Sequence, residues 1–183
     1  MSSLAGQILI APPQLTDPHF HQTVVLMIQH DAQGAFGLIL NRPAQQTVAD
    51  LWAMVREGPC LASGYVHQGG PVQGPLTLLH RDPVLGDEAV LPGVFHTATA
   101  TSIEQLIATG ADPLRCYVGY AGWGAAQLEA ELQTASWLTL QAEAEHIFHD
   151  GPEDLWTQVY ARALDDRPYP TYEPPPRDDP GLN

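Results

Sequence analysis

The residues best suited to bind an anion lie in the segment Asn41-Arg42-Pro43. A planar guanidinium makes two parallel hydrogen bonds to a carboxylate or a phosphate. Arg42 is the first cation of the chain, and Pro43 should end the preceding strand because proline has no N–H to donate to a ladder. The alternative role is an internal salt bridge, which the 21 acidic residues favour by their abundance. The sequence leaves both roles open.

A second candidate is a glycine-rich stretch in which Gly122 and Gly124 flank Trp123. Residues 114–118 have the apolar character of a buried strand, and residues 125–133 have helical spacing. We therefore expect a glycine turn between them, where free N–H groups at the helix start could bind an anion. The glycine spacing fits neither a dinucleotide fingerprint nor a phosphate loop. Trp123 would be either a platform for a ligand or a buried plug for the turn.

Two histidine pairs are the candidates for a metal site. Asp17, His19 and His21 alternate, so on a strand they would share one face. His146 and His149 are spaced for one face of a helix. Neither pair has a third ligand at a convincing spacing, so we expect no metal and no other cofactor.

Nucleophilic catalysis has weak support in the sequence. No serine lies in a G-x-S-x-G turn. Cys116 falls within an apolar strand, where a thiol is usually inert, and the cation nearest to Cys60 in sequence is Arg56. All seven basic residues are arginine, which removes the chemistry that depends on lysine.

The strongly acidic composition limits the partners. The formal net charge is −14, and residues 116–161 contain seven acids and no arginine. Binding to a nucleic acid backbone needs a cluster of cations, so we expect no direct binding of nucleic acid. No apolar run reaches the roughly 20 residues of a membrane span, and the N-terminus lacks a signal-peptide pattern. With only two cysteines, these features predict a cytoplasmic protein that does not contact membranes.

The order of motifs resembles the AlgH/YqgE family of bacterial proteins. Gly119-Tyr-Ala-Gly-Trp-Gly124 followed by Gln127-Leu-Glu129 resembles the family signature. The resemblance covers residues 4–164 and implies a protein with no established biochemical activity. The chain departs from the family pattern at residues 74–79, before His80, and at the proline-rich residues 165–176. The other matching segments, in family order, are Leu4–Ala11, Asp17 with Phe20 and Thr23–Val25, Gln29–Asp31, Gly34–Pro43, Gly69–Val72, His80, Trp137–Leu138, Ile147–Phe148 and Trp156.

Strands and helices interleave along the chain without strict alternation. This order predicts an α+β fold, a single AlgH-like domain with a mixed, largely antiparallel β-sheet surrounded by helices. We assign the domain to residues 1–164 and expect a disordered, acidic, proline-rich tail over residues 165–183. The expected elements are a strand at 7–11, a hairpin of 23–29 and 35–40 turning at Gly34, a helix at 48–57 capped by Thr47, strands at 65–67 and 76–79 around a turn at Gly69–Pro71, a helix with a capping box at Ser102–Gln105 ending at Gly110, and a last helix starting at Pro152.

Three functions are compatible with these observations. The first is a binding or regulatory module that acts through a protein or a small ligand. The second is a hydrolase-like enzyme with a pocket around Asn41, Arg42 and His80, and the third and weakest is a DNA-binding regulator. A deep pocket holding His80 beside Arg42 would favour the enzyme, and a flat apolar patch would favour the module.

The family motifs predict where a binding surface would lie. Glycine-rich turns at strand ends let a partner approach the backbone closely. We therefore expect at least two of three segments to lie side by side and to form one surface. These segments are Asn41–Arg42, Gly69–Gly70–Pro71 and Gly122–Trp123–Gly124.

Overall fold

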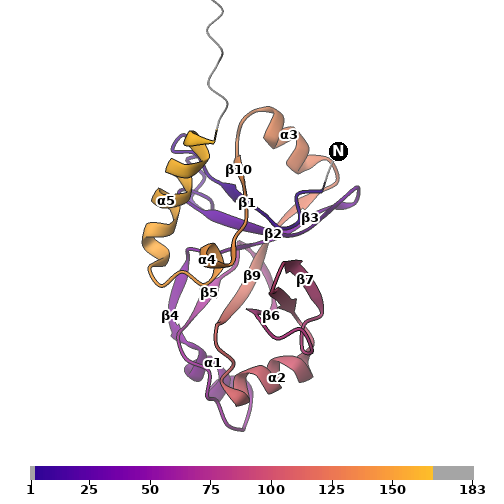
Figure 1. The fold of residues 1–183 in the computed structure, drawn as a ribbon, viewed down its shortest axis with the longest axis vertical. Coiled ribbons are helices and arrows are strands. Elements are labelled where there is room, and N and C mark those ends of the chain that lie inside the picture. Colours follow the sequence, from indigo (N-terminus) through magenta and orange to yellow (C-terminus); the bar gives the residue numbers. More distant parts are fainter. Residues whose placement is uncertain (1–2, 167–183) are drawn as a thin grey trace, which may run out of the picture.

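The protein is described by a computed structural model that covers residues 3–166. Its sheet is built around one long strand, β9 (Leu114–Gly124). The second half of β9 pairs antiparallel with β3 (Gly34–Ile39). Its first half lies between β5 (Tyr65–Gln68), which is parallel to it, and β6 (Val72–His80), which is antiparallel. Figure 1 shows β9 running from an upper group of strands to a lower one. The predicted α+β fold with a mixed, largely antiparallel sheet is confirmed.

The upper group of strands is antiparallel, in the order β10-β1-β2-β3. Its other members are β1 (Gln7–Ile10), β2 (Val24–Asp31) and β10 (Leu138–Gln141). The β2–β3 hairpin closes where Asp31 pairs with Gly34, whose positive φ of 144° confirms the predicted turn glycine. Helix α3 (Gln127–Gln133) packs on one face of these strands, with Leu128 in a cluster around Leu9 and Val25.

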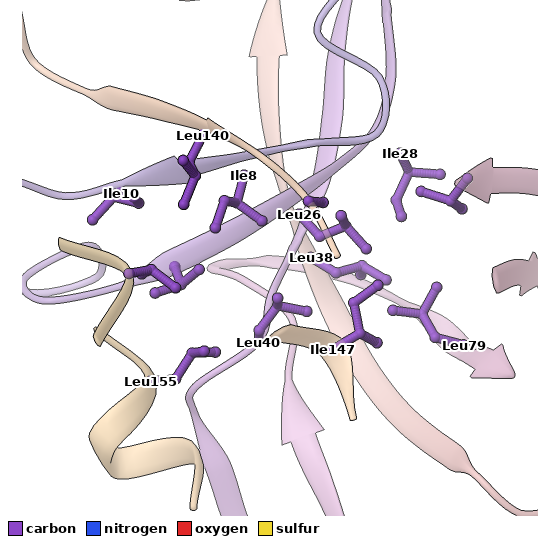
Figure 2. Close-up of a cluster of buried hydrophobic side chains, with 14 of the residues drawn as sticks. Ile8, Ile10, Leu26, Ile28, Leu38, Leu40, Leu79, Leu140, Ile147 and Leu155 are labelled. Atoms are coloured by element: carbon purple, nitrogen blue, oxygen red, sulfur yellow. The ribbon is translucent and has the colours of Figure 1, made fainter. Parts of the chain in front are cut away.

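The opposite face of the upper strands carries the largest core. It is covered by α4 (Ala144–Ile147) and α5 (Pro152–Asp165). Figure 2 shows side chains of the upper strands and of β6 meeting these helices, because alternate residues of each strand point to the same face. The buried members drawn and labelled there are Ile8, Ile10, Leu26, Ile28, Leu38, Leu40, Leu79, Leu140, Ile147 and Leu155.

The lower group of strands is covered on one face by two helices. Helix α1 (Val48–Val55) begins with the predicted cap, since Thr47 accepts from the Asp50 N–H and the Asp50 carboxylate accepts from the Thr47 N–H. Helix α2 (Ala100–Thr109) ends at Gly110, as predicted, with a left-handed φ of 67°. The remaining strands are β4 (Pro43–Thr47), which pairs with β5, and the hairpin of β7 (Glu88–Leu91) and β8 (Val94–Thr97), which follows β6.

Two predictions about local structure are wrong. The expected turn at Gly122–Gly124 is the end of β9, where these glycines pair with Phe36 and Gly34. The strand therefore continues to Gly124, whose N–H donates to the Gln127 side chain at 3.0 Å, and α3 begins only at Gln127. Ser102, expected to cap a helix, lies inside α2, whose N-cap position is Thr99 without a side-chain hydrogen bond.

The chain ends are only partly described. Helix α5 starts with Pro152 at its first turn, as predicted, and ends at Asp165. Most of the predicted tail, residues 167–183, lies outside the described residues. Among residues 3–166, no helix combines the length and the apolar character needed to cross a bilayer.

Candidate functional site

Three chain segments meet where β3, β5 and β9 come together, and we call this point the glycine crossing (Gly69, Gly70 and Gly119). The Gly69 N–H donates to the Val118 carbonyl at 2.9 Å, and the Gly69 carbonyl accepts from the N–H that ends β3 at 2.8 Å. A Cβ on Gly70 would overlap the carbonyl of Tyr120. Gly119 has a φ of 74°, which side chains rarely adopt, and a Cβ there would lie 2.8 Å from the Val72 carbonyl oxygen. Glycine is therefore required for the backbones to touch.

Two of the three predicted segments lie side by side at this crossing. The carbonyl of Arg42 accepts from the N–H of Gln68 at 2.8 Å, so Asn41–Arg42 runs beside the residues that lead into Gly69. The buried Asn41 amide accepts from the Val24 N–H and donates to the Gln22 carbonyl, both at 2.9 Å. Its side chain therefore fastens the loop before β2 to the end of β3.

Arg42 also holds the loop before β2 against the end of β3. Its guanidinium donates to the carbonyl of His21, and the residue is half-buried. Within residues 3–166 no carboxylate lies within ion-pair distance of Arg42, so the salt bridge considered from the sequence does not form there. The described part of the chain thus gives Arg42 a backbone partner and no anionic one.

His80 is used by the fold itself. It is fully buried at the end of β6, where its Nδ1 accepts from the Asp82 N–H at 3.2 Å. The proton must then lie on Nε2, which donates to Thr97 Oγ1 at 2.9 Å, and Thr97 donates onward to the Leu85 carbonyl. Burial lowers the pKa of His80, which favours this neutral ring. Both ring nitrogens already have hydrogen-bond partners within the fold, so His80 has no free atom with which to bind a substrate.

The third predicted segment belongs to a different set of contacts, which we call the indole cluster (Phe20, Trp123, Glu131 and Trp137). The two indole N–H groups donate to the same carboxylate oxygen of Glu131, at 3.0 and 2.8 Å. The ring of Phe20 stacks on Trp123 and meets Trp137 edge-on. Trp123 is only 6% exposed, so the structure gives it the role of a buried plug.

Beside the glycine crossing lies an open hollow of about 650 Å³, which we call the valine groove. Val72 and Val118 are 40% and 39% exposed, and no aspartate, glutamate or arginine lines it. Helices α1 and α2 pack on Val66 and Cys116 but leave Val118, farther along the same face of β9, half-exposed. The lining residues are Ala44, Gln46, Leu51, Val66, His67, Gln68, Gly70, Pro71, Val72, Gln73, Gly74, Val118 and Gly119.

Sequence analysis missed a row of polar residues at one level of three neighbouring strands. His67 pairs in register with Tyr117, which pairs with Thr77. Each residue has a buried polar atom without a hydrogen-bond partner in the described chain. These atoms are Nδ1 of His67, the phenol oxygen of Tyr117 and Oγ1 of Thr77. Burial, with a smaller effect of Arg115, lowers the pKa of His67 to about 4. The signal in the sequence was the position of His67 within a predicted strand, residues 65–67.

The histidine pairs considered for metal binding make local hydrogen bonds. Asp17 accepts from the His19 N–H, and the segment forms a turn, so the strand that the prediction required is absent from this part of the described chain. His146 Nδ1 and His149 Nδ1 accept from the backbone N–H groups of Glu143 and Gly151. Among residues 3–166 no three histidine, cysteine or acidic side chains come together as a metal site.

Comparisons with known proteins agree with the resemblance seen in the motifs. The model of the AlgH-like family matches residues 8–167. A UPF0301 protein of Streptomyces avermitilis is 36% identical over 202 residues, covering 100% of this chain and 97% of that protein. A UPF0301 protein of Myxococcus xanthus is 39% identical over 162 residues, covering 85% and 88% of the two chains.

Two solved structures share this fold. The solution structure of the AlgH protein from Pseudomonas aeruginosa has a TM-score of 0.73 at 31% identity, over 91% of this chain and 95% of that one. The crystal structure of a Corynebacterium diphtheriae protein also has a TM-score of 0.73, over 93% of this chain and 90% of that one. At 21% identity, the second likeness concerns the fold alone.

Proposed function

This chain belongs to the AlgH-like family, and we propose that it acts as a binding module whose valine groove holds an extended, apolar segment of a protein partner. The observation that carries this proposal is the lining of the groove. Two half-exposed valines and no charged side chain face a hollow of about 650 Å³ in a protein of net charge −14. A module of this kind regulates its partner by binding to it, without a chemical step.

Apolar contact is the recognition that this groove offers. The surface that Val72 and Val118 leave in contact with water gains roughly 25 cal/mol for each Å² that a partner covers. The polar side chains around them are the amides of Gln46, Gln68 and Gln73. These amides can pair with the main chain of a bound segment, while the valines hold its apolar side chains.

An extended segment fits better than a compact ligand because a strand edge is open beside the groove. Strand β4, which contributes Ala44 and Gln46 to the lining, pairs only with β5 among the described strands. Its outer edge therefore has backbone groups that another strand can bind. We expect cationic residues on either side of the apolar segment, because the net charge of −14 attracts them.

Support for a module over the hydrolase-like alternative comes from His80, whose ring nitrogens are both used within the fold. The charge of the chain speaks against direct binding of nucleic acid. We place the module in the cytoplasm, since Cys60 and Cys116 are free thiols, as in a reducing compartment.

The test is a selection of displayed peptides on the whole chain, followed by NMR of the valine methyl groups. We expect enrichment of extended peptides with alternating apolar residues, and shifts of the Val72 and Val118 signals on binding. Val118→Asp should weaken binding at least tenfold. Val84→Asp is the matched control, because Val84 is 86% exposed and does not line the groove.

Circular dichroism of each variant separates lost binding from lost structure, and Val72→Asp provides a second variant if Val118→Asp does not fold. Peptides that bind Val118→Asp and Val72→Asp as well as the unchanged chain would overturn the proposal. So would shifts confined to valines outside the groove.

A further inference from the structure

A smaller cavity of about 230 Å³ lies on the other side of β5, and we call it the Arg115 cavity. Val66 and Gln68 line the valine groove, Tyr65 lines the cavity, and His67 borders both spaces. Ligand sites for drug-sized molecules usually measure about 300–1,000 Å³. This cavity therefore suits a group smaller than a nucleotide.

Arg115 brings a positive charge to the cavity wall, which Asp150 also lines. Its guanidinium donates to the carbonyls of Leu114 and His149 at 3.2 and 3.1 Å and lies 6.0 Å from the ring centre of Phe148. The acid at ion-pair distance in the described chain is Asp150, at 3.9 Å and with a fully exposed side chain. Neutral groups thus hold the guanidinium in place, and its ion-pair partner among residues 3–166 is a fully exposed carboxylate close to the outer limit of ion-pair distance. By contrast, Arg56 and Arg162 each pair with a glutamate, at 2.8 and 2.7 Å.

His67 lines the same cavity and has an unused hydrogen-bonding atom. The residue is 6% exposed, and its Nδ1 has no partner among residues 3–166. Leaving such a buried atom unpaired costs about 1–3 kcal/mol, so proteins seldom keep one without a use. Nδ1 itself has less than 1 Å² of accessible surface, so the ring would reach an oxygen atom of a ligand through its other nitrogen, Nε2.

Two further donors point to the same kind of ligand. His149 Nδ1 accepts from the Gly151 N–H, so its proton lies on Nε2 and is available to donate. Helix α5 is 14 residues long, its first residue Pro152 lines the cavity, and no side chain caps its start. The positive end of the helix dipole therefore faces this region. Glu153 and Asp154 of the first turn are exposed and do not line the cavity.

We propose that the Arg115 cavity binds a small oxyanion, the carboxylate or phosphate group of a ligand, between the Arg115 guanidinium and the imidazoles of His67 and His149. Planar guanidinium and oxyanion match in a two-bond geometry, and the imidazole N–H groups complete the shell. The site shares His67 with the valine groove, but its test does not involve the peptide partner.

The experiment titrates the full chain with inorganic phosphate and, separately, with acetate, in a buffer free of both and at constant ionic strength. We expect saturable NMR shifts of the Arg115 side-chain N–H and of the amides of Gly151 and Glu153 with at least one anion. Saturation by phosphate alone identifies a phosphoryl ligand, and saturation by acetate alone identifies a carboxylate. No saturable response to either anion would overturn the proposal.

Variants show whether the response arises in the cavity. Arg115→Gln should reduce the affinity at least tenfold, while Arg56→Gln, which removes an exposed arginine paired with Glu104, should leave it unchanged. Arg115→Gln also loses two bonds to carbonyls, so His149→Ala, with an expected fall of about threefold or more, serves if that variant does not fold. An affinity that is unchanged in the folded variants would overturn the site.

Discussion

The glycine crossing contains one glycine of the family signature, Gly119, and the indole cluster lies beside two others, Gly122 and Gly124, but the two regions use them differently. At the crossing, a Cβ on Gly70 would overlap the backbone of Tyr120, so direct contact between two main chains requires glycine there. Beside the indole cluster, the nearest atom to a Cβ on Gly124 would be the side-chain oxygen of Gln127, at 3.9 Å. Side chains hold that region together, through Glu131 and two indoles. One sequence motif thus joins a region fixed by its backbone to a region fixed by its side chains.

The sharpest test of this comparison replaces one glycine in each region by alanine. Gly70→Ala should lower the free energy of unfolding by about 4 kcal/mol or more, because strands must separate to admit the methyl group. Gly124→Ala should change it by less than about 1 kcal/mol, since its methyl meets only ordinary contact. Urea denaturation measures both. Equal losses in the two variants would break the distinction.

The free energy of unfolding should depend on pH through His67, which neighbours the glycine crossing and not the indole cluster. Its pKa in the folded protein is about 4, below the ordinary 6.5. Between these two pH values the unfolded chain therefore carries a proton on His67 and the folded chain does not. The free energy of unfolding should therefore be fully retained above pH 6.5 and fall as the pH drops toward 4. This histidine contributes about 3 kcal/mol to that fall.

The pH effect is measured as the difference in slope between the unchanged chain and His67→Gln, because burial also lowers the pKa of His80 and His146. His67→Gln should flatten the dependence between pH 6.5 and 4. His19→Gln is the control, since His19 is exposed and should leave the slope as it is. An unchanged slope in His67→Gln would contradict the buried, neutral imidazole.

In the indole cluster the decisive change is the loss of a carboxylate. Glu131→Ala leaves the N–H groups of Trp123 and Trp137 without their acceptor, which should cost about 2 kcal/mol. Gln133→Ala, at an exposed position of the same helix, should cost less than about 0.5 kcal/mol. Tryptophan fluorescence during urea unfolding measures both. If Glu131→Ala proved as harmless as its control, side-chain bonding would not be what holds this region.

The smallest expected effect is that of Arg42→Ala. The side chain is half-buried and donates to one backbone carbonyl, so its loss should cost about 1 kcal/mol. The same measurement on Arg56→Ala, which removes an exposed ion pair with Glu104, sets the scale for a surface arginine. A loss of 3 kcal/mol or more for Arg42→Ala would indicate a buried ion pair instead.

Local signals predicted the parts of the fold that depend on a few adjacent residues. The cap at Thr47, the turn at Gly34, the stop at Gly110 and the helix start at Pro152 are of this kind. The end of β9 was not predictable in this way, because its pairing with β3 joins residues more than 80 positions apart.

The cavity beside β5 escaped sequence analysis for a similar reason. His67, Arg115 and His149 come from three parts of the chain separated by more than 30 residues each. Nothing in their neighbourhoods indicates that they line one space. The sequence predicted that at least two of the three glycine-rich or strand-end segments lie side by side, without saying which, and Asn41–Arg42 lies beside the residues that lead into Gly69.

The central position of β9 governs the order in which this protein can fold during its synthesis. Strands β5 and β6 leave the ribosome before β9, yet β9 pairs with both of them and with β3. At 5–20 residues per second, the ribosome needs roughly 2–9 s to travel from the end of β6 to the end of β9. During that interval β6 can pair with β8 on one edge, but its other edge lacks β9. Between the synthesis of residue 80 and that of residue 124, the nascent chain therefore has an unpaired strand edge of the kind that promotes aggregation.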